Sequence, residues 1–238
     1  MTERATTRGD GAWLAVVALG AVSCVATLGV IFLRAPVEST MGIVQKVFYF
    51  HVPAAYAMYL GALGCFIGSA GYLYSPGARW DAIARGGADV AVTMGMAVMI
   101  SGPLWASKAW GRPWVWDPRL TTALLSVLIY IAYLVMRAFA GGGEGERRFA
   151  AALGVLGAAN LPIIHFSVQR WGGMHPNVIG GGGGGLHHPD MRLALGMGFT
   201  TFTLLALVLL VVRTKLHLAE SRLAALEQQA IELGIDED

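Results

Sequence analysis

The fold is decided by uncharged apolar stretches, the first of which reads AWLAVVALGAVSCVATLGVIFL over residues 12–33. A helix needs about 20 mostly apolar residues to cross the hydrocarbon layer of a membrane, which is roughly 30 Å thick. This stretch is long enough to span, and it contains no charged side chain. It is also longer than the apolar part of a cleavable signal peptide, which has about 7–15 residues. We therefore predict an uncleaved first transmembrane helix.

Five further stretches have the length and apolar character of membrane spans. Backbone groups in lipid must satisfy their own hydrogen bonds, so each span is expected to be a helix. Six spans use about 120 of the 238 residues, which leaves no room for a large extramembrane domain. The predicted fold class is an all-α integral membrane protein, a six-transmembrane-helix bundle. The expected spans are residues 12–33, 52–74, 88–105, 120–137, 150–166 and 193–212.

The composition excludes several other classes of protein. Charged residues make up 13% of the chain and hydrophobic residues 55%, whereas soluble domains carry about 25% charged residues. The net charge of +2 lacks the basic excess of a nucleic-acid-binding protein, so no nucleic-acid partner is expected. Cys24 and Cys65 both lie inside apolar runs, where they provide neither a disulfide framework nor a CxxC metal motif.

The distribution of lysine and arginine predicts the orientation of the spans. With the N-terminus inside, ten basic residues fall in the inner segments and seven in the outer ones. The positive-inside rule then favours an N-in, C-in arrangement. With six spans, the connections at 34–51, 105–119 and 167–192 must all open on the same, outer side.

Tryptophan and histidine gather in these three outer connections. They contain five of the seven tryptophans and four of the six histidines. Aromatic rings often line membrane interfaces, which accounts for isolated residues such as Trp13 and Trp80. A simple interface belt does not explain four tryptophans within twelve residues, accompanied by two arginines and an aspartate. We therefore predict a binding site at Trp105, Trp110, Arg112, Trp114, Trp116, Asp117 and Arg119.

Two histidines lie in the connections on either side of this segment. His51 precedes a helix that is entered through Pro53, and His175 lies in the connection between the last two spans. Two imidazoles near an aromatic surface suit haem, a planar and mostly apolar disc whose iron takes axial nitrogen ligands. Indole faces can cover such a ring. Arg112 and Arg119 are placed to bind the two carboxylates of haem through paired hydrogen bonds.

The segment WGRPWVWDPRLT at residues 110–121 resembles the tryptophan-rich WWD signature of the haem-handling proteins of cytochrome c maturation. With six spans in 238 residues, the chain is similar to the short CcmC-type haem exporters of the bacterial System I. Supporting motifs are FHVP at 50–53, IHFSV at 164–168 and WGGMHP at 171–176. Pro113 stands where many relatives have another tryptophan, so we expect one aromatic ring fewer here.

The resemblance implies a cofactor, its ligands and a set of partners. CcmC-type proteins lie in the bacterial inner membrane and hold haem on the periplasmic side. One outer histidine on each flank of the WWD loop is an axial ligand, and the matching residues are His51 and His175. Such proteins pass haem to the periplasmic chaperone CcmE, within a complex that contains CcmA, CcmB and CcmD. The resemblance also implies that ATP hydrolysis in this complex belongs to CcmA. This chain has no GxxxxGK[ST] motif, and it is itself expected not to be an enzyme.

Several residue assignments have alternatives. His187 or His188 is the alternative to His175 as the second ligand. His165, near the end of the fifth span, is interpreted as a core histidine, with a role in the haem pocket as the alternative. Asp117 either anchors an indole or backbone N–H group or contacts the ligand itself.

The sequence also predicts how the chain is organised outside the site. Residues 1–215 are expected to form the membrane domain, with the WWD loop at 105–121. Residues 216–238 are expected to form a cytoplasmic helix, whose heptad stripe is too short to stand alone. Residues 36–50 are predicted to form a short interfacial helix that braces His51.

Glycine is used in two ways. The run at 180–185 lacks the lysine of a phosphate-binding loop and is predicted to be a flexible linker. Four glycines in the second span recur every three or four residues, which favours close packing against another helix. They are Gly61, Gly64, Gly68 and Gly71.

Two other functions and a longer haem-handling relative are the alternatives to haem delivery by a CcmC-type protein. A membrane subunit that carries electrons through haem b places its ligands within the spans, and only His165 comes near such a place. A channel or small-solute transporter needs charged or polar residues at mid-membrane, and the span centres offer little beyond Asn160 and hydroxyl groups. A CcsA-like haem-handling relative needs more spans than 238 residues provide.

Overall fold

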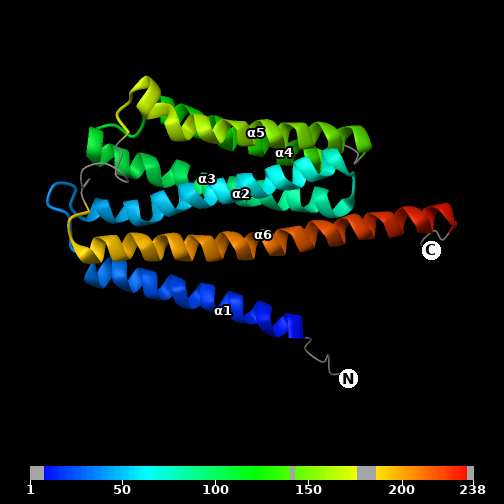
Figure 1. The fold of residues 1–238 in the computed structure, drawn as a ribbon, viewed down its shortest axis with the longest axis horizontal. Coiled ribbons are helices and arrows are strands. Elements are labelled where there is room, and N and C mark those ends of the chain that lie inside the picture. The colour runs from blue at the N-terminus through cyan, green and yellow to red at the C-terminus, as the bar shows by residue number, and fades with distance from the viewer. Residues whose placement is uncertain (1–7, 140–142, 176–185, 235–238) are drawn as a thin grey trace. The chain divides into compact units, whose positions relative to one another are not determined.

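The structure, a computed structural model, describes residues 8–139, 143–175 and 186–234, and all of its long elements are helices (Figure 1). Within these ranges no strand forms, and the one β-bridge joins Glu38 to Gly42. In chain order the elements are α1 (Arg8–Gly29), the π-helix η1 (Val30–Arg34), the 3-10 helix η2 (Ile43–Val47), α2 (Phe48–Tyr74), α3 (Ala78–Trp110), α4 (Pro118–Phe139), α5 (Glu144–Trp171) and α6 (Pro189–Glu232).

Six helices in the described part of the chain are long and apolar enough to cross a membrane. One of these spans includes α1 together with η1, and another includes η2 together with α2. This confirms the predicted all-α fold with six spans, which is that of a multi-pass membrane protein.

Two helices continue further than the sequence predicted. α3 ends at Trp110 and α5 at Trp171, each beyond the expected span ends at 105 and 166. Hydropathy marks only the part of a helix that suits hydrocarbon, whereas the helix itself continues until a residue stops it. Gly111 (φ 71°) and Gly172 (φ 73°) follow the two helices directly in the left-handed conformation that ends many helices.

The chain forms two compact units, and every α-helix after α1 contributes to both. The described residues of the first unit are 8–57, 94–121, 167–175 and 186–208. Those of the second unit are 58–93, 122–139, 143–166 and 209–234. All nine residues of the predicted haem site fall in the first unit.

The first unit joins α1, α2 and α6 through apolar and hydroxyl side chains. The Thr201 hydroxyl of α6 shares hydrogen bonds with Ser23 (2.6 Å) and Thr27 (2.8 Å) of α1. Hydroxyl groups that pair across helices in this way avoid the cost of burial without a partner. The buried apolar residues of this unit's core are Ile31, Ala35, Phe48, Tyr49, Met191, Ala194 and Leu195.

The connection before α2 differs from the predicted helix over residues 36–50. A turn in which the Gly42 N–H donates to the Glu38 carbonyl comes first, and η2 then runs directly into α2. Lys46 of η2 is buried and donates its ammonium group to the Ile31 carbonyl at 2.7 Å. Carbonyls in the last turn of a helix lack partners within it. The connection therefore caps the end of η1, and residues 48–50 already belong to α2.

Glycines allow α2 and α3 to pack closely in the second unit. A Cβ atom on Gly61 would clash with the backbone of Ala91, and one on Gly68 would clash with the backbone of Ala84. The glycine spacing predicted close packing, and these contacts confirm it.

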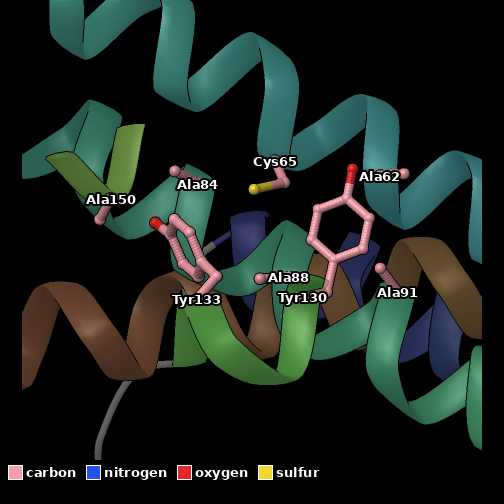
Figure 2. Close-up of a cluster of buried hydrophobic side chains, with 8 residues drawn as sticks. All are labelled: Ala62, Cys65, Ala84, Ala88, Ala91, Tyr130, Tyr133 and Ala150. Carbon is pink, nitrogen blue, oxygen red and sulfur yellow. The ribbon is translucent and has the colours of Figure 1, made fainter. Parts of the chain in front are cut away.

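Two tyrosines of α4 are buried among small side chains in the same unit (Figure 2). Tyr130 and Tyr133 lie among alanines of α2, α3 and α5, with Cys65 beside them. Small residues leave room for the two rings, so the packing of α4 depends on the same small residues that bring α2 and α3 together.

Charged side chains of the second unit are paired where they are buried. Arg137 of α4 bridges Asp81 of α3 and Glu146 of α5, both at 2.7 Å, and its own side chain is 5% exposed. His217 of α6 is buried and hydrogen-bonds to Asp89 of α3 at 2.6 Å. These pairs satisfy the requirement that buried charges find partners. They link α3, α4, α5 and α6.

α6 is one continuous helix from Pro189 to Glu232, so no separate helix begins at residue 216. Leu223 and Leu226, which belong to the predicted heptad stripe, are exposed. The glycine run at 180–185, for which a flexible linker was predicted, lies outside the described residues.

Candidate functional site

His51 lies at the end of the first turn of α2, which begins at Phe48. The prediction that His51 lies in the connection before the helix is therefore wrong. That prediction rested on Pro53, since proline interrupts most helices but is tolerated near a helix start. Here α2 continues through Pro53, so the backbone of His51 is held by the helix itself.

The His51 ring lies against Ser101 and Gly102 of α3. The Ser101 hydroxyl donates its hydrogen to the Ala97 carbonyl at 2.6 Å, and its oxygen lies 2.9 Å from His51 Nδ1. Because the single hydroxyl hydrogen is already used, Nδ1 must be the donor in this second bond. A Cβ atom on Gly102 would lie 3.2 Å from Cε1 of the ring, so glycine is what allows this close approach.

This hydrogen bond fixes the chemical state of the His51 ring. With its hydrogen on Nδ1, a neutral imidazole carries its lone pair on Nε2. Ligating histidines commonly have the other ring N–H fixed by such a bond. In this state Nε2 of His51 is the ring nitrogen that could hold a metal.

The tryptophans form two pairs. Trp105 and Trp110 are on α3 and pack edge to face with ring centroids 5.7 Å apart. Trp114 and Trp116 are in the loop 111–117 and pack in the same way at 5.8 Å. The sequence predicted an aromatic surface in an outer loop. The structure instead has two pairs of tryptophans, and the two rings within each pair are nearly perpendicular. One pair lies at the end of α3 and the other lies in the loop. Trp116 is 78% exposed, so its ring is accessible to a ligand or a partner.

Asp117 fastens the Trp-rich loop to the segment after α5. Its carboxylate is buried and accepts backbone N–H groups from Arg119 (2.8 Å), Met174 (2.7 Å) and His175 (3.3 Å). Gly173 leaves room for this contact, because a Cβ atom there would clash with the Asp117 carboxylate. Of the two alternatives for Asp117, the contacts match the backbone anchor.

His175 is thereby held beside the Trp-rich loop. Its Nδ1 lies 3.3 Å from Nη1 of Arg119, and its backbone N–H reaches Asp117. The imidazoles of His51 and His175 are close enough to interact electrostatically, although they come from α2 and from the segment after α5. The two histidines that the sequence selected as ligands therefore lie in the same unit, within the range of an electrostatic interaction.

Two indole N–H groups at the site are buried without a hydrogen-bond partner among the described residues. They are the Nε1 groups of Trp105 and Trp114. Leaving a buried donor unsatisfied costs about 1–3 kcal/mol, so such groups call for an acceptor that a ligand could supply. Arg112 lies exposed in the loop 111–117, where its guanidinium forms no hydrogen bond or ion pair with any described residue.

The remaining histidines lie in other surroundings. His165 is on the exposed surface of α5, packed edge to face with Phe166 at 4.9 Å, so the core interpretation is wrong. His165 belongs to the second unit, whereas the nine residues of the predicted haem site belong to the first. His188 accepts the N–H of Asp190 at 3.2 Å at the start of α6, and the neighbouring His187 is exposed.

Comparison with known proteins assigns the family. The family model CcmC, described as "Heme exporter protein C", matches residues 4–229. The chain belongs to the CcmC family. His51, both tryptophan pairs and His175 all lie within the matched region.

Individual members of the CcmC family share about 30% of their residues with this chain. "Heme exporter protein C" of Bradyrhizobium diazoefficiens is 30% identical over 81% of this chain and 74% of its own length. The protein of the same name in Paracoccus denitrificans is 28% identical over 92% of each chain. A "Putative cytochrome c biosynthesis ccmC-like mitochondrial protein" of Marchantia polymorpha is 28% identical over 76% of this chain and 77% of its own length.

Proposed function

We propose that this chain binds haem between His51 and His175 and delivers it to a periplasmic chaperone during cytochrome c maturation. The observation that carries the proposal is that His175 acts electrostatically on His51 from a separate segment, in the same compact unit as the two tryptophan pairs. The names of the relatives support the same reading, since they refer to haem export and cytochrome c biosynthesis.

The residues present fit haem better than a bare metal ion. Within the described ranges no group of three or more His, Cys, Asp or Glu side chains gathers to hold an ion. A metal bound by His51 and His175 must therefore bring its remaining ligands with it, as the iron of haem does. Haem supplies an iron with two axial positions, an apolar ring and two carboxylates.

The side chains of the site take distinct roles in this proposal. His51 and His175 would hold the iron through ring nitrogens, and the tryptophan pairs would cover the porphyrin and exclude water. The buried N–H groups of Trp105 and Trp114 suit the carboxylates as acceptors. The guanidinium groups of Arg112 and Arg119 can bind the same carboxylates. Asp117 keeps His175 in place, since its contacts are with backbone.

The proposed setting is the inner membrane of a bacterium, with the site on the periplasmic side. The excess of lysine and arginine in inner segments supports the N-in, C-in orientation that this requires. The proposed recipient is the chaperone CcmE, and the proposed complex includes CcmA, CcmB and CcmD. CcmA would hydrolyse ATP in that complex, while this chain binds and presents haem without changing a bond.

Haem transfer in cells tests this function. In a bacterium that lacks its own CcmC but retains the other Ccm proteins, this chain is expected to restore covalent haem on CcmE. His175→Ala is expected to lower that signal by at least about tenfold, because losing a partner in a ligand's outer shell alone costs 10–100-fold. The measurement is haem staining of CcmE after denaturing electrophoresis, normalised to the amount of each chain in the membrane.

His187→Ala serves as the matched control, since His187 is exposed and lies close to His175 in the sequence. It is expected to leave haem on CcmE at the wild-type amount. Wild-type haem on CcmE with His175→Ala, together with a loss with His187→Ala, would transfer the ligand role to His187.

A further inference from the structure

The two proposed axial ligands are in opposite hydrogen-bonding states. Ser101 accepts from Nδ1 of His51, which leaves the lone pair of that ring on Nε2. At His175 the neighbour of Nδ1 is Nη1 of Arg119, at 3.3 Å. A guanidinium group can only donate hydrogen bonds, so Nδ1 of His175 must be the acceptor.

This contact makes His175 unable to bind a metal as it stands. A neutral imidazole whose Nδ1 accepts a hydrogen bond carries its own hydrogen on Nε2. One nitrogen of His175 is then occupied by Arg119 and the other by hydrogen. His51 shows the reverse arrangement and needs no change to bind through Nε2.

We infer that Arg119 is a latch on His175, so that the chain binds haem through one permanent ligand, His51, and one exchangeable ligand, His175. This inference rests on the proposed function and adds an asymmetry to it. Arg119 is a positioning residue here, since it acts on the availability of the His175 nitrogens. When Arg119 turns away, the hydrogen on Nε2 of His175 is lost to water and Nδ1 gains one from water, which frees the lone pair of Nε2.

The backbone of Arg119 and His175 is held in place, so the two side chains can change partners without a movement of the backbone. Asp117 accepts the backbone N–H groups of both Arg119 and His175, so the two residues stay close whichever partner each side chain takes. A carboxylate is a stronger partner for arginine than an imidazole is. The carboxylates of haem would therefore draw Arg119 away from His175.

The latch also provides a way to release the ligand. If Arg119 returns to His175, the chain keeps only the bond from His51. Two-step release of this kind requires no movement of α2 or α3, which hold His51 through Ser101 and Gly102.

The first test uses the haem-free protein and does not depend on the proposed function. The full chain with ¹⁵N-labelled histidine is placed in lipid nanodiscs, and the ring nitrogens are recorded by NMR. We expect His51 to carry its hydrogen on Nδ1 and His175 to carry its hydrogen on Nε2. Arg119→Met is expected to remove the preference at His175 only. Arg170→Met, at the exposed end of α5, is expected to change neither ring.

The second test measures release of iron protoporphyrin dimethyl ester, in which both carboxylates are blocked. Transfer of the ester to apomyoglobin gives its rate of dissociation from the full chain. Arg119→Met is expected to slow this rate by about tenfold. A factor of this size corresponds to the free energy of one hydrogen bond to a charged group. The effect is expected to vanish in a His175→Ala background, where Arg119 has nothing to compete for.

The outcomes separate the latch from the proposed function. Hydrogen on Nδ1 of His175 in the wild-type chain would overturn the latch, and so would an ester rate that Arg119→Met leaves unchanged or increases. A faster rate would also be the result if Arg119 only stabilised the bound state. If the wild-type chain takes up neither haem nor the ester, the proposed function fails, and the NMR result still decides whether Arg119 holds His175.

Discussion

Replacing His51 by glycine is expected to remove almost all haem from the purified chain. His51 is the proposed ligand whose ring is already fixed, by Ser101 on one side and by the close approach to Gly102 on the other. We expect affinity to fall by at least about 100-fold, because losing only an outer-shell partner of a ligand costs 10–100-fold. The measurement is haem per polypeptide after purification, determined from the pyridine haemochrome spectrum.

Added imidazole provides the control for folding in this experiment. The glycine variant retains the space that the ring occupied, so millimolar imidazole is expected to restore haem binding. Imidazole is expected to have no such effect on the wild-type chain. Wild-type haem content in the glycine variant without imidazole would contradict the assignment of His51.

Asp117→Ala is expected to produce the second large effect, a loss of about 10–100-fold in haem affinity. The buried carboxylate accepts three backbone N–H groups, and two of them belong to Met174 and His175. Without it, those donors lose their acceptor and the segment that carries His175 comes away from the Trp-rich loop. The expected spectrum of ferric haem changes from a six-coordinate to a five-coordinate form, since only His51 remains as a ligand. Titration with haem, followed by absorption, measures both the affinity and the coordination.

Glu38→Ala is the matched control for the Asp117 variant. Glu38 also accepts backbone N–H groups, from Thr40 and Met41, but those contacts close its own turn and do not reach His175. The Met41 N–H holds the pKa of Glu38 below its ordinary value. Haem affinity is expected to be unchanged in this variant. An equal loss in both variants would mean that Asp117 acts through general stability of the outer connections.

The six helices could be predicted from the sequence because hydropathy and length report directly on burial in lipid. The ends of the helices could not, since they depend on local stops that lie outside the apolar runs. Gly111 and Gly172 are such stops, and both come directly after a tryptophan. The same extension of α3 moved Trp105 and Trp110 from an expected loop onto a helix.

The choice of His51 and His175 followed from their positions in the sequence and from the family motifs, and in the structure His175 acts electrostatically on His51. What the sequence did not reveal is how each ring is held. Ser101 was the available signal, since a serine in an apolar span needs a partner for its hydroxyl group. Gly173 was another, as one of two consecutive glycines shortly before His175.

His165 shows why a histidine in a predicted span is hard to interpret. Hydropathy places it in the fifth span but gives no information on which side of the helix faces other helices. Neighbouring Ile164 and Ser167 are buried, whereas His165 and Phe166 are exposed. The predicted core position of His165 was wrong because the sequence does not show which face of α5 packs against other helices. Only the packing of the helices determines that face.

The most direct measurement of the central claim is a cryo-EM map of the full chain in nanodiscs with haem bound. The account predicts iron between Nε2 of His51 and a ring nitrogen of His175, with the tryptophan pairs of α3 and of the loop 111–117 against the porphyrin. Iron bound instead at His165, His187 or His188, with His51 and His175 apart from it, would contradict the account.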